Sequence, residues 1–190
     1  DEIVQPEEVK GPLKPGAILE VNGQVLASMV EECGAQSTLA DTVPDRIEKV
    51  KEAVVAGLMD GYDVILTSPG SSAGSEDHTP AALSQLGELL VHGVTVMPGK
   101  PTLLAAVQDR PVVGIPGYPV SAAVSFREFV RPLLFQIQGL QAPEPQSVEA
   151  FIGRKLPSKP GLEEHVRVIL GKVAERIVAL PLAGGAGMLT

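Results

Sequence analysis

The chain has 190 residues, of which 44% are hydrophobic and 3% aromatic, and its formal net charge at pH 7 is −8. This acidic balance, without a cluster of Lys or Arg, argues against nucleic acid as a partner, and a single cysteine, Cys33, excludes an intramolecular disulfide and a Cys-rich metal site. No stretch is long and apolar enough to cross a bilayer, and the N-terminus is acidic, unlike a signal peptide, so we expect a cytoplasmic protein with no membrane partner.

The first third of the chain alternates between extended and helical patterns. Residues 1–16 are polar and rich in Pro and predict an irregular leading segment. Extended segments are predicted at 17–20, 36–42 and 63–67, the last of them a buried central strand. The helices between these segments have characteristic ends, with an N-cap at Asn22 and a stop at Gly34, then a start at Pro44-Asp45 and a stop at Gly61.

The middle of the chain continues this alternation. Helices are predicted at 79–86 and 120–138, and extended segments at 88–97, 103–107 and 111–115. The last two segments flank a hairpin-like turn at 108–110. Alternating helices and strands indicate a three-layer α/β domain with a mostly parallel sheet over residues 1–140.

The pattern changes after residue 140. Residues 141–147 predict a linker. Strand-like segments follow at 148–156, 165–172 and 176–180, with no helical pattern between them. We therefore expect residues 148–190 to be the start of a small, barrel-like β domain, and the chain to be a fragment at this end.

The most informative stretch is the loop that follows the strand at 63–67. A strand, a loop of small polar residues and a helix start form an arrangement in which backbone N–H groups point at an anion. The loop residues expected to bind that anion are Ser68, Gly70, Ser71, Ser72, Gly74 and Ser75. The adjacent carboxylates of Glu76 and Asp77 suit a divalent cation. The alternative is an ordinary strand-to-helix connection.

Two further loops, at 98–101 and 116–121, also follow predicted strands. Open α/β sheets bind ligands beyond the carboxyl ends of their strands, so the three loops are expected to converge on one crevice. Lys100, held between two prolines, is interpreted as a phosphate or oxyanion contact, with a solvated lysine as the alternative. Asp45 is either a functional carboxylate or a residue favoured in the first turn of a helix.

Together these stretches resemble the molybdopterin-binding domain of the molybdopterin molybdenumtransferase (MoeA-like) family, whose eukaryotic relative is the gephyrin E domain. The resemblance covers residues 1–140 and is carried by residues 68–77, 98–101 and 116–121, in that order. The β-rich tail resembles the first part of the family's C-terminal domain.

The resemblance implies a role in molybdenum cofactor biosynthesis. In this family molybdate is inserted into adenylylated molybdopterin with release of AMP, supported by Mg²⁺, and full-length members are homodimers. Carried over, the loop from Ser68 would cradle the pterin or its phosphates, and Asp45, Asp77 and Lys100 would be catalytic. The further binding residues would be Pro98, Gly99, Pro116, Gly117 and Ser121, and the metal ligands Glu2, Asp45 and Asp77.

The chain departs from the family pattern in three places. The family's first strand ends in a Thr-Gly-Asp-Glu-Leu motif, whereas this chain begins at Asp1-Glu2-Ile3, so that strand is expected to lie upstream. Met97 stands where many relatives have a basic residue, and Tyr118 where Asn is frequent. These departures bear on the catalytic competence of the chain alone.

Two other functions remain as alternatives. One is a related enzyme on the same fold, a molybdopterin adenylyltransferase or a CinA-like pyrophosphatase. The β-rich tail argues against the adenylyltransferase, which typically stops after the α/β domain. The other is a non-catalytic, gephyrin-like binding module.

Overall fold

The computed structural model describes residues 3–4, 9, 11–15, 17–68 and 78–182. Its helical segments are α1 (Asn22–Glu32), α2 (Ile47–Met59), α3 (Thr79–Leu86), α4 (Pro119–Ser125), the π-helical turn η2 (Phe126–Val130) and α5 (Arg131–Ile137). Its strands are β1 (Ile3–Val4), β2 (Ile18–Leu19), β3 (Ile65–Thr67), β4 (Glu88–His92), β5 (Val96–Met97), β6 (Leu103–Val107), β7 (Arg110–Gly114), β8 (Phe151–Ile152), β9 (Glu163–Glu164), β10 (Val168–Val173) and β11 (Arg176–Pro181). Within these described ranges, no helix is long and apolar enough to cross a membrane.

The largest sheet has four strands in the order β3-β7-β6-β4. The α/β class is confirmed, but only the β3–β7 pair is parallel, so the described sheet is mixed and not mostly parallel. The reason is local, because Gln108 and Asp109 adopt positive φ values of 52° and 60° and reverse the chain between β6 and β7. Strand β3, predicted to be central, stands at one end of this order.

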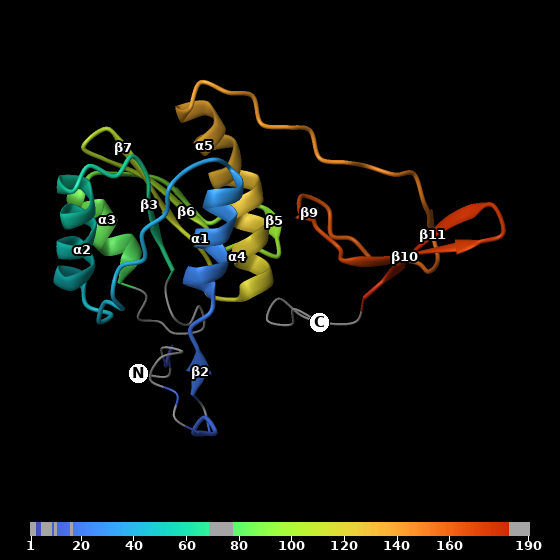
Figure 1. Ribbon diagram of the computed structural model, residues 1–190, viewed down its shortest axis with the longest axis horizontal. Coiled ribbons are helices and arrows are strands. Elements are labelled where there is room, and N and C mark those ends of the chain that lie inside the picture. The colour runs from blue at the N-terminus through green and yellow to red at the C-terminus, as the bar shows by residue number, and fades with distance from the viewer. Residues whose placement is uncertain (1–2, 5–8, 10, 16, 69–77, 183–190) are drawn as a thin grey trace.

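Helices cover the four-stranded sheet on both faces (Figure 1). On one face α1 and the α4–α5 segment pack around Phe126 and Val130, which are 1% and 0% exposed. On the other face α2 and α3 contribute Val54, Leu58 and Leu83 to a second core cluster with β6 and β7. Each such side chain stabilises the fold by about 1.5–3 kcal/mol through its transfer out of water. The predicted three-layer arrangement is thus observed.

The start of α1 differs from the prediction. Asn22 is the first helical residue and not the N-cap, which is Val21. The carboxylate of Glu20 accepts the Gly23 N–H instead, at 3.1 and 3.2 Å. The Asn22 side chain is buried and its Nδ2 donates to the Gly117 carbonyl at 2.6 Å, so it serves a tertiary contact and not its own helix.

The strand predicted at 36–42 is wrong. Residues 35–44 contain neither helix nor strand, and most of their side chains are exposed. A strand needs a partner to pair with or a face to bury, and this stretch has few apolar side chains to bury.

The long helix predicted at 120–138 is confirmed as a continuous helical segment that contains one π-helical turn. Its three parts follow one another without a break from Pro119 to Ile137, and the Arg131 N–H bonds to the Phe126 carbonyl five residues back. This turn carries Arg127 and Glu128.

The β-rich tail forms a three-stranded sheet in the order β10-β11-β8. Every residue of β10 is exposed, in contrast to β6, where each second side chain is buried. Residues 141–150, which include the predicted linker, contain no helix or strand, and Figure 1 shows them leading from α5 towards the second sheet. The separate strand β9 pairs in parallel with β5, next to the Pro-Gly-Lys-Pro loop.

Candidate functional site

Two of the three predicted loops line one cavity of about 470 Å³. A third wall comes from the chain segment that continues β9 and from Leu182, which follows β11. The lining residues are Met97, Pro98, Gly99, Lys100 and Pro101 from the first loop, Pro116, Tyr118, Val120 and Ser121 from the second, and Glu164, His165, Val166, Arg167 and Leu182 from the third wall. We call this space the loop cavity.

The structure therefore brings together five of the residues predicted to form a site: Pro98, Gly99, Lys100, Pro116 and Ser121. The predicted convergence arises from strand pairing. The Ile115 N–H donates to the Thr67 carbonyl at 2.7 Å, so the ends of β3 and β7 lie side by side and their loops leave from the same edge of the sheet. Ser68, the first residue after β3, is exposed there.

The other predicted residues do not line the loop cavity. Asp45 is exposed, ahead of α2, and Gly117 instead offers its carbonyl to Asn22. The remaining predicted residues, Glu2, Gly70, Ser71, Ser72, Gly74, Ser75 and Asp77, lie outside the described residues.

A buried pair of hydroxyl groups fixes the shape of the Pro-Gly-Lys-Pro loop. The Thr102 hydroxyl donates to the Gly99 carbonyl at 2.6 Å, and its oxygen lies 2.7 Å from the Ser125 hydroxyl at the end of α4. Both side chains are completely buried. Since Thr102 uses its own proton on Gly99, Ser125 is the donor of the second bond. These two bonds thereby fix the backbone next to Lys100 relative to helix α4.

Gly99 itself is required by this arrangement. Its φ of +131° is one that L side chains rarely adopt, and a Cβ at this position would lie 2.9 Å from the Ser125 Oγ. The glycine in this motif therefore allows the loop to press against α4.

Charged residues line the loop cavity from two sides. Lys100 lines it from the first loop and Arg167 from the third wall, which also contains Glu164, whose carboxylate accepts the Lys159 backbone N–H at 3.2 Å. Two cations in one hollow, together with the N–H groups of a first helical turn, form a suitable environment for an oxyanion.

Arg167 and His165 were missed by the sequence reasoning, as were Thr102 and Ser125. No local sequence signal indicates that residues 163–167 lie beside residues 95–97. Their proximity comes from the pairing of β5 with β9. In this pairing the Glu163 N–H donates to the Thr95 carbonyl at 2.8 Å, and the His165 N–H donates to the Met97 carbonyl at 2.7 Å. The one available signal was Met97, which stands where many relatives have a basic residue. A basic residue from another part of the chain could have been expected to replace that charge.

The described residues do not assemble the predicted magnesium site. Of the expected ligands only Asp45 is described, and it is exposed. One described group of potential ligands, Glu128, Glu163 and His165, has its donor atoms within 4.8 Å of one another. Its imidazole does not match the all-oxygen coordination that Mg²⁺ prefers.

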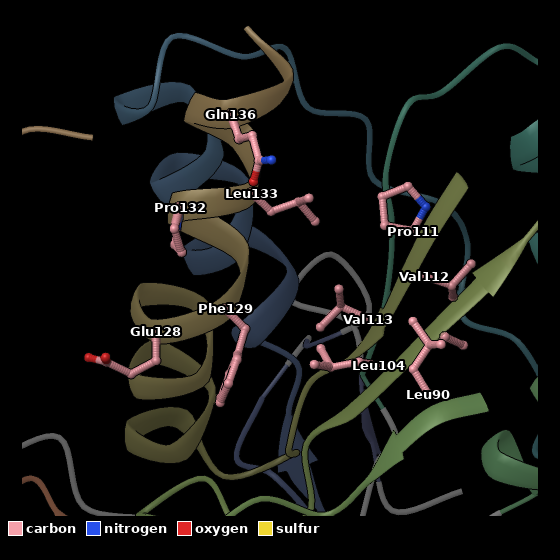
Figure 2. Close-up of a pocket in the computed structure, with 11 residues that line it drawn as sticks. Leu90, Leu104, Pro111, Val112, Val113, Glu128, Phe129, Pro132, Leu133 and Gln136 are labelled. Atoms are coloured by element: carbon pink, nitrogen blue, oxygen red, sulfur yellow. The ribbon is translucent and has the colours of Figure 1, made fainter. Parts of the chain in front are cut away.

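A second hollow differs in chemistry. It has a volume of about 330 Å³ and lies between the η2–α5 segment and strands β4, β6 and β7. Figure 2 shows Phe129 and Leu133 of the helix directed towards the sheet, where Leu90, Leu104 and Val113 lie. It offers apolar surface and no cation, so it is not a site for an oxyanion.

Comparisons with known proteins match this architecture. Residues 1–136 match the family model described as "Probable molybdopterin binding domain". The chain is 33% identical over 181 residues to molybdopterin molybdenumtransferase 2 of Mycobacterium tuberculosis, covering 88% of this chain and 43% of that protein. It is 32% identical over 139 residues to the molybdopterin molybdenumtransferase of Haemophilus influenzae, covering 73% and 33%.

Solved structures agree. A molybdopterin biosynthesis MoeA protein from Pyrococcus horikoshii superposes with a TM-score of 0.71 at 30% identity, over 98% of this chain and 44% of that one. The chain thus spans less than half the length of these relatives, and the likeness extends through the β-rich tail as well as the α/β part.

Proposed function

The chain belongs to the molybdopterin-binding domain family, and from this premise we propose that it is the substrate-binding part of a molybdenum-inserting transferase. The proposed reaction inserts molybdate into adenylylated molybdopterin and releases AMP. The names of its relatives support a place in molybdenum cofactor biosynthesis. In this proposal molybdate and adenylylated molybdopterin are the substrates.

One observation carries the proposal. Lys100 and Arg167 line the same cavity, between two loops whose shape is fixed by buried hydrogen bonds. Molybdate and phosphate are both tetrahedral oxyanions. A guanidinium group binds an oxyanion through two parallel hydrogen bonds, and an ammonium group binds it as a compact positive charge. We assign these two cations to the oxyanion.

The roles proposed for other residues follow the family resemblance. The loop from Ser68 through Ser71, Ser72, Gly74 and Ser75 would hold the pterin or its phosphates, with Pro98, Gly99, Pro116 and Ser121 shaping the opposite walls. Ser121 is buried at the start of α4, where its backbone N–H belongs to the first turn. Asp45, Asp77 and Glu2 would be the ligands of Mg²⁺, which would neutralise phosphate charge when bound.

In the proposed reaction the phosphoanhydride of adenylylated molybdopterin is cleaved by water. A P–O bond to AMP breaks, a P–O bond to the water oxygen forms, and the proton passes to solvent. In the insertion two Mo–S bonds to the dithiolene form, and one oxygen of molybdate leaves as water with the two thiol protons, without a change of oxidation state. Negative charge grows on the leaving phosphate, so the positive charge of Lys100 stabilises the transition state more than the substrate. We also propose that the full-length protein is a homodimer, lies in the cytoplasm and has no nucleic acid or membrane partner.

The test is a calorimetric titration with molybdate and with adenylylated molybdopterin, with and without Mg²⁺. Lys100→Ala and Arg167→Ala should each weaken binding by about tenfold, the equivalent of one charge-assisted hydrogen bond. Asp77→Asn should weaken only the Mg²⁺-dependent part. Lys172→Ala is the matched control, since it removes a cation on exposed β10 and should bind like the parent chain. Equal affinity in all variants would reject the loop cavity as the site.

The products of the reaction distinguish the transferase from the adenylyltransferase and from a non-catalytic binding module. A transferase releases AMP only when molybdate is present, whereas an adenylyltransferase consumes ATP and molybdopterin. A binding module retains adenylylated molybdopterin unchanged. Because the relatives are more than twice as long as this chain, the product assay is to be made on the full-length protein.

A further inference from the structure

A charged cluster joins the long helix to the third wall of the loop cavity. It consists of Arg127 and Glu128 from η2, and Glu163 and His165 from β9 and the residue after it. Arg127 Nη2 lies 2.9 Å from His165 Nδ1, and Arg127 Nε donates to Glu128 Oε1 at 3.1 Å. We call these four residues the seam cluster.

The contact with Arg127 determines which ring nitrogen of His165 carries the proton. A guanidinium group can only donate, so His165 Nδ1 accepts and the neutral ring has its proton on Nε2. That Nε2 is buried and lies 3.3 Å from Glu163 Oε1 and 3.8 Å from Glu128 Oε1. The imidazole is thus held between a cation on one side and two carboxylates on the other.

The same tautomer argues against a metal ion in the cluster. A histidine binds a metal through an unprotonated nitrogen. Arg127 occupies the lone pair of Nδ1, and the proton occupies that of Nε2. The three donor groups that lie within reach of one ion are therefore better explained by charge complementarity. Among the described residues the His165 Nε2 faces two carboxylates but makes no hydrogen bond to either.

The position of His165 links this cluster to the loop cavity. Its backbone N–H is bonded to the Met97 carbonyl directly before the Pro-Gly-Lys-Pro loop, and the residue is part of the lining of the loop cavity. Arg167, two residues further on, lines it as well, and the Arg167 carbonyl accepts the Leu182 N–H at 2.9 Å. A change in the packing of His165 would move the segment that places Arg167.

We propose that Arg127 and His165 are positioning residues for anion binding: Arg127 orients His165, and His165 keeps Arg167 in the third wall of the loop cavity, which Lys100 lines from the first loop. The identity of the anion rests on the proposed function, but the positioning does not. Arg127 and Glu163 are largely exposed, with side chains 56% and 68% accessible. Exposed ion pairs add little to global stability, so the effect should appear in affinity and not in the unfolding midpoint.

The test combines affinity, stability and spectroscopy on the whole chain. Molybdate alone and inorganic phosphate alone are titrated into the parent chain and into Arg127→Met, Arg127→Lys and Arg176→Met. Arg127→Met should bind about tenfold more weakly, as for one lost hydrogen bond to a charged group. Arg127→Lys keeps a donor and should recover part of the affinity. Arg176→Met removes the same charge at the exposed first residue of β11 and should match the parent chain.

The tautomer is read separately from the ¹⁵N resonances of the imidazole, with His165→Phe used for assignment. In the parent chain His165 should be protonated at Nε2, and this preference should weaken in Arg127→Met while the unfolding midpoint stays unchanged. Protonation at Nδ1 in the parent chain would overturn the inference.

The outcomes also separate this inference from the proposed function. If Lys100→Ala loses molybdate and Arg127→Met binds it as the parent chain does, positioning by Arg127 is refuted and the oxyanion site stands. If the parent chain binds neither anion, the proposed function fails and so does the role of Arg127 and His165 in anion binding, whereas the imidazole spectra of the parent and Arg127→Met still test whether Arg127 orients His165.

Discussion

The two sheets of this molecule have similar strands and very different surroundings. Strand β6 buries every second residue, among them Leu103 and Val107 at 2% and 1% exposure, because helices cover both faces of its sheet. Strand β10 also has large apolar residues, yet Ile169, Leu170 and Val173 are 57%, 50% and 64% exposed. Apolar content alone thus does not tell which strand lies in a core. The difference comes from the helices that precede and follow each strand in the chain.

The largest expected contrast uses the same substitution in both regions. A Cβ at Gly87, between α3 and β4, would lie 2.1 Å from the Ala106 carbonyl oxygen, whereas a Cβ at Gly171 in β10 would meet no atom within 4 Å. Gly87→Ala should therefore prevent folding or destabilise the chain by more than about 4 kcal/mol, as expected for a backbone clash in a core. Gly171→Ala should be neutral or stabilising by up to about 1 kcal/mol.

Urea unfolding followed by circular dichroism measures both effects. Similar unfolding midpoints for the two variants would mean that the packing of α3 on β6 is looser than described.

The next contrast compares two leucines. Leu83 of α3 is 0% exposed and Leu170 of β10 is 50% exposed. Leu83→Ala should cost about 2–5 kcal/mol because it leaves a cavity in a packed core. Leu170→Ala should change the free energy of unfolding by about 0.5 kcal/mol or less. A cost at Leu170 comparable to that at Leu83 would show that β10 is covered in solution, for instance by a second copy of the chain.

A third prediction concerns the buried hydroxyl pair. Thr102→Val removes the donor to Gly99 and the acceptor of Ser125 in a fully buried place, so it should cost about 1–3 kcal/mol. Thr102→Ser keeps the hydroxyl and should retain most of the stability. If Thr102→Val also weakens molybdate binding more than its stability loss explains, the loop geometry is set by this pair.

The smallest expected effect is the pH dependence due to Cys33. Burial raises the pKa of this thiol above its usual value of 9.0. The folded chain therefore keeps the proton at pH values where the unfolded chain has lost it, and the free energy of unfolding should fall as the pH rises above 9. Cys33→Ala should lack this part of the slope in alkaline urea titrations. An identical slope in both chains would contradict the prediction.

Local sequence signals account for much of the fold. The helix at 79–86 has the predicted bounds because Pro80 and Gly87 mark its ends, and the β6–β7 hairpin was found because a turn separates two apolar runs. The loops at 98–101 and 116–121 were identified by glycine, proline and lysine. These features depend only on neighbours in the chain.

Features that depend on distant partners were missed. Asn22 is typical of an N-cap, but its side chain bonds to a residue 95 positions away. Arg167 reaches the loop cavity only because β9 pairs with β5. Residues 36–42 have a strand-like pattern, but no neighbouring strand was available among the described residues. Sequence patterns state what a segment prefers, and the tertiary partner decides the outcome.

The π-helical turn has a consequence for the phase of the long helix. Its buried residues Ala122, Phe126, Val130 and Leu134 follow at steps of four. In an α-helix four residues rotate by roughly 400°, so each step would drift about 40° away from the core. The wider turn at Phe126–Val130 counters this drift and keeps one row of side chains facing the sheet. The turn thus behaves as a one-residue insertion: without one of its residues an unbroken α-helix would bring Leu134 within roughly 20° of the same row, because eleven residues rotate by about 1100°.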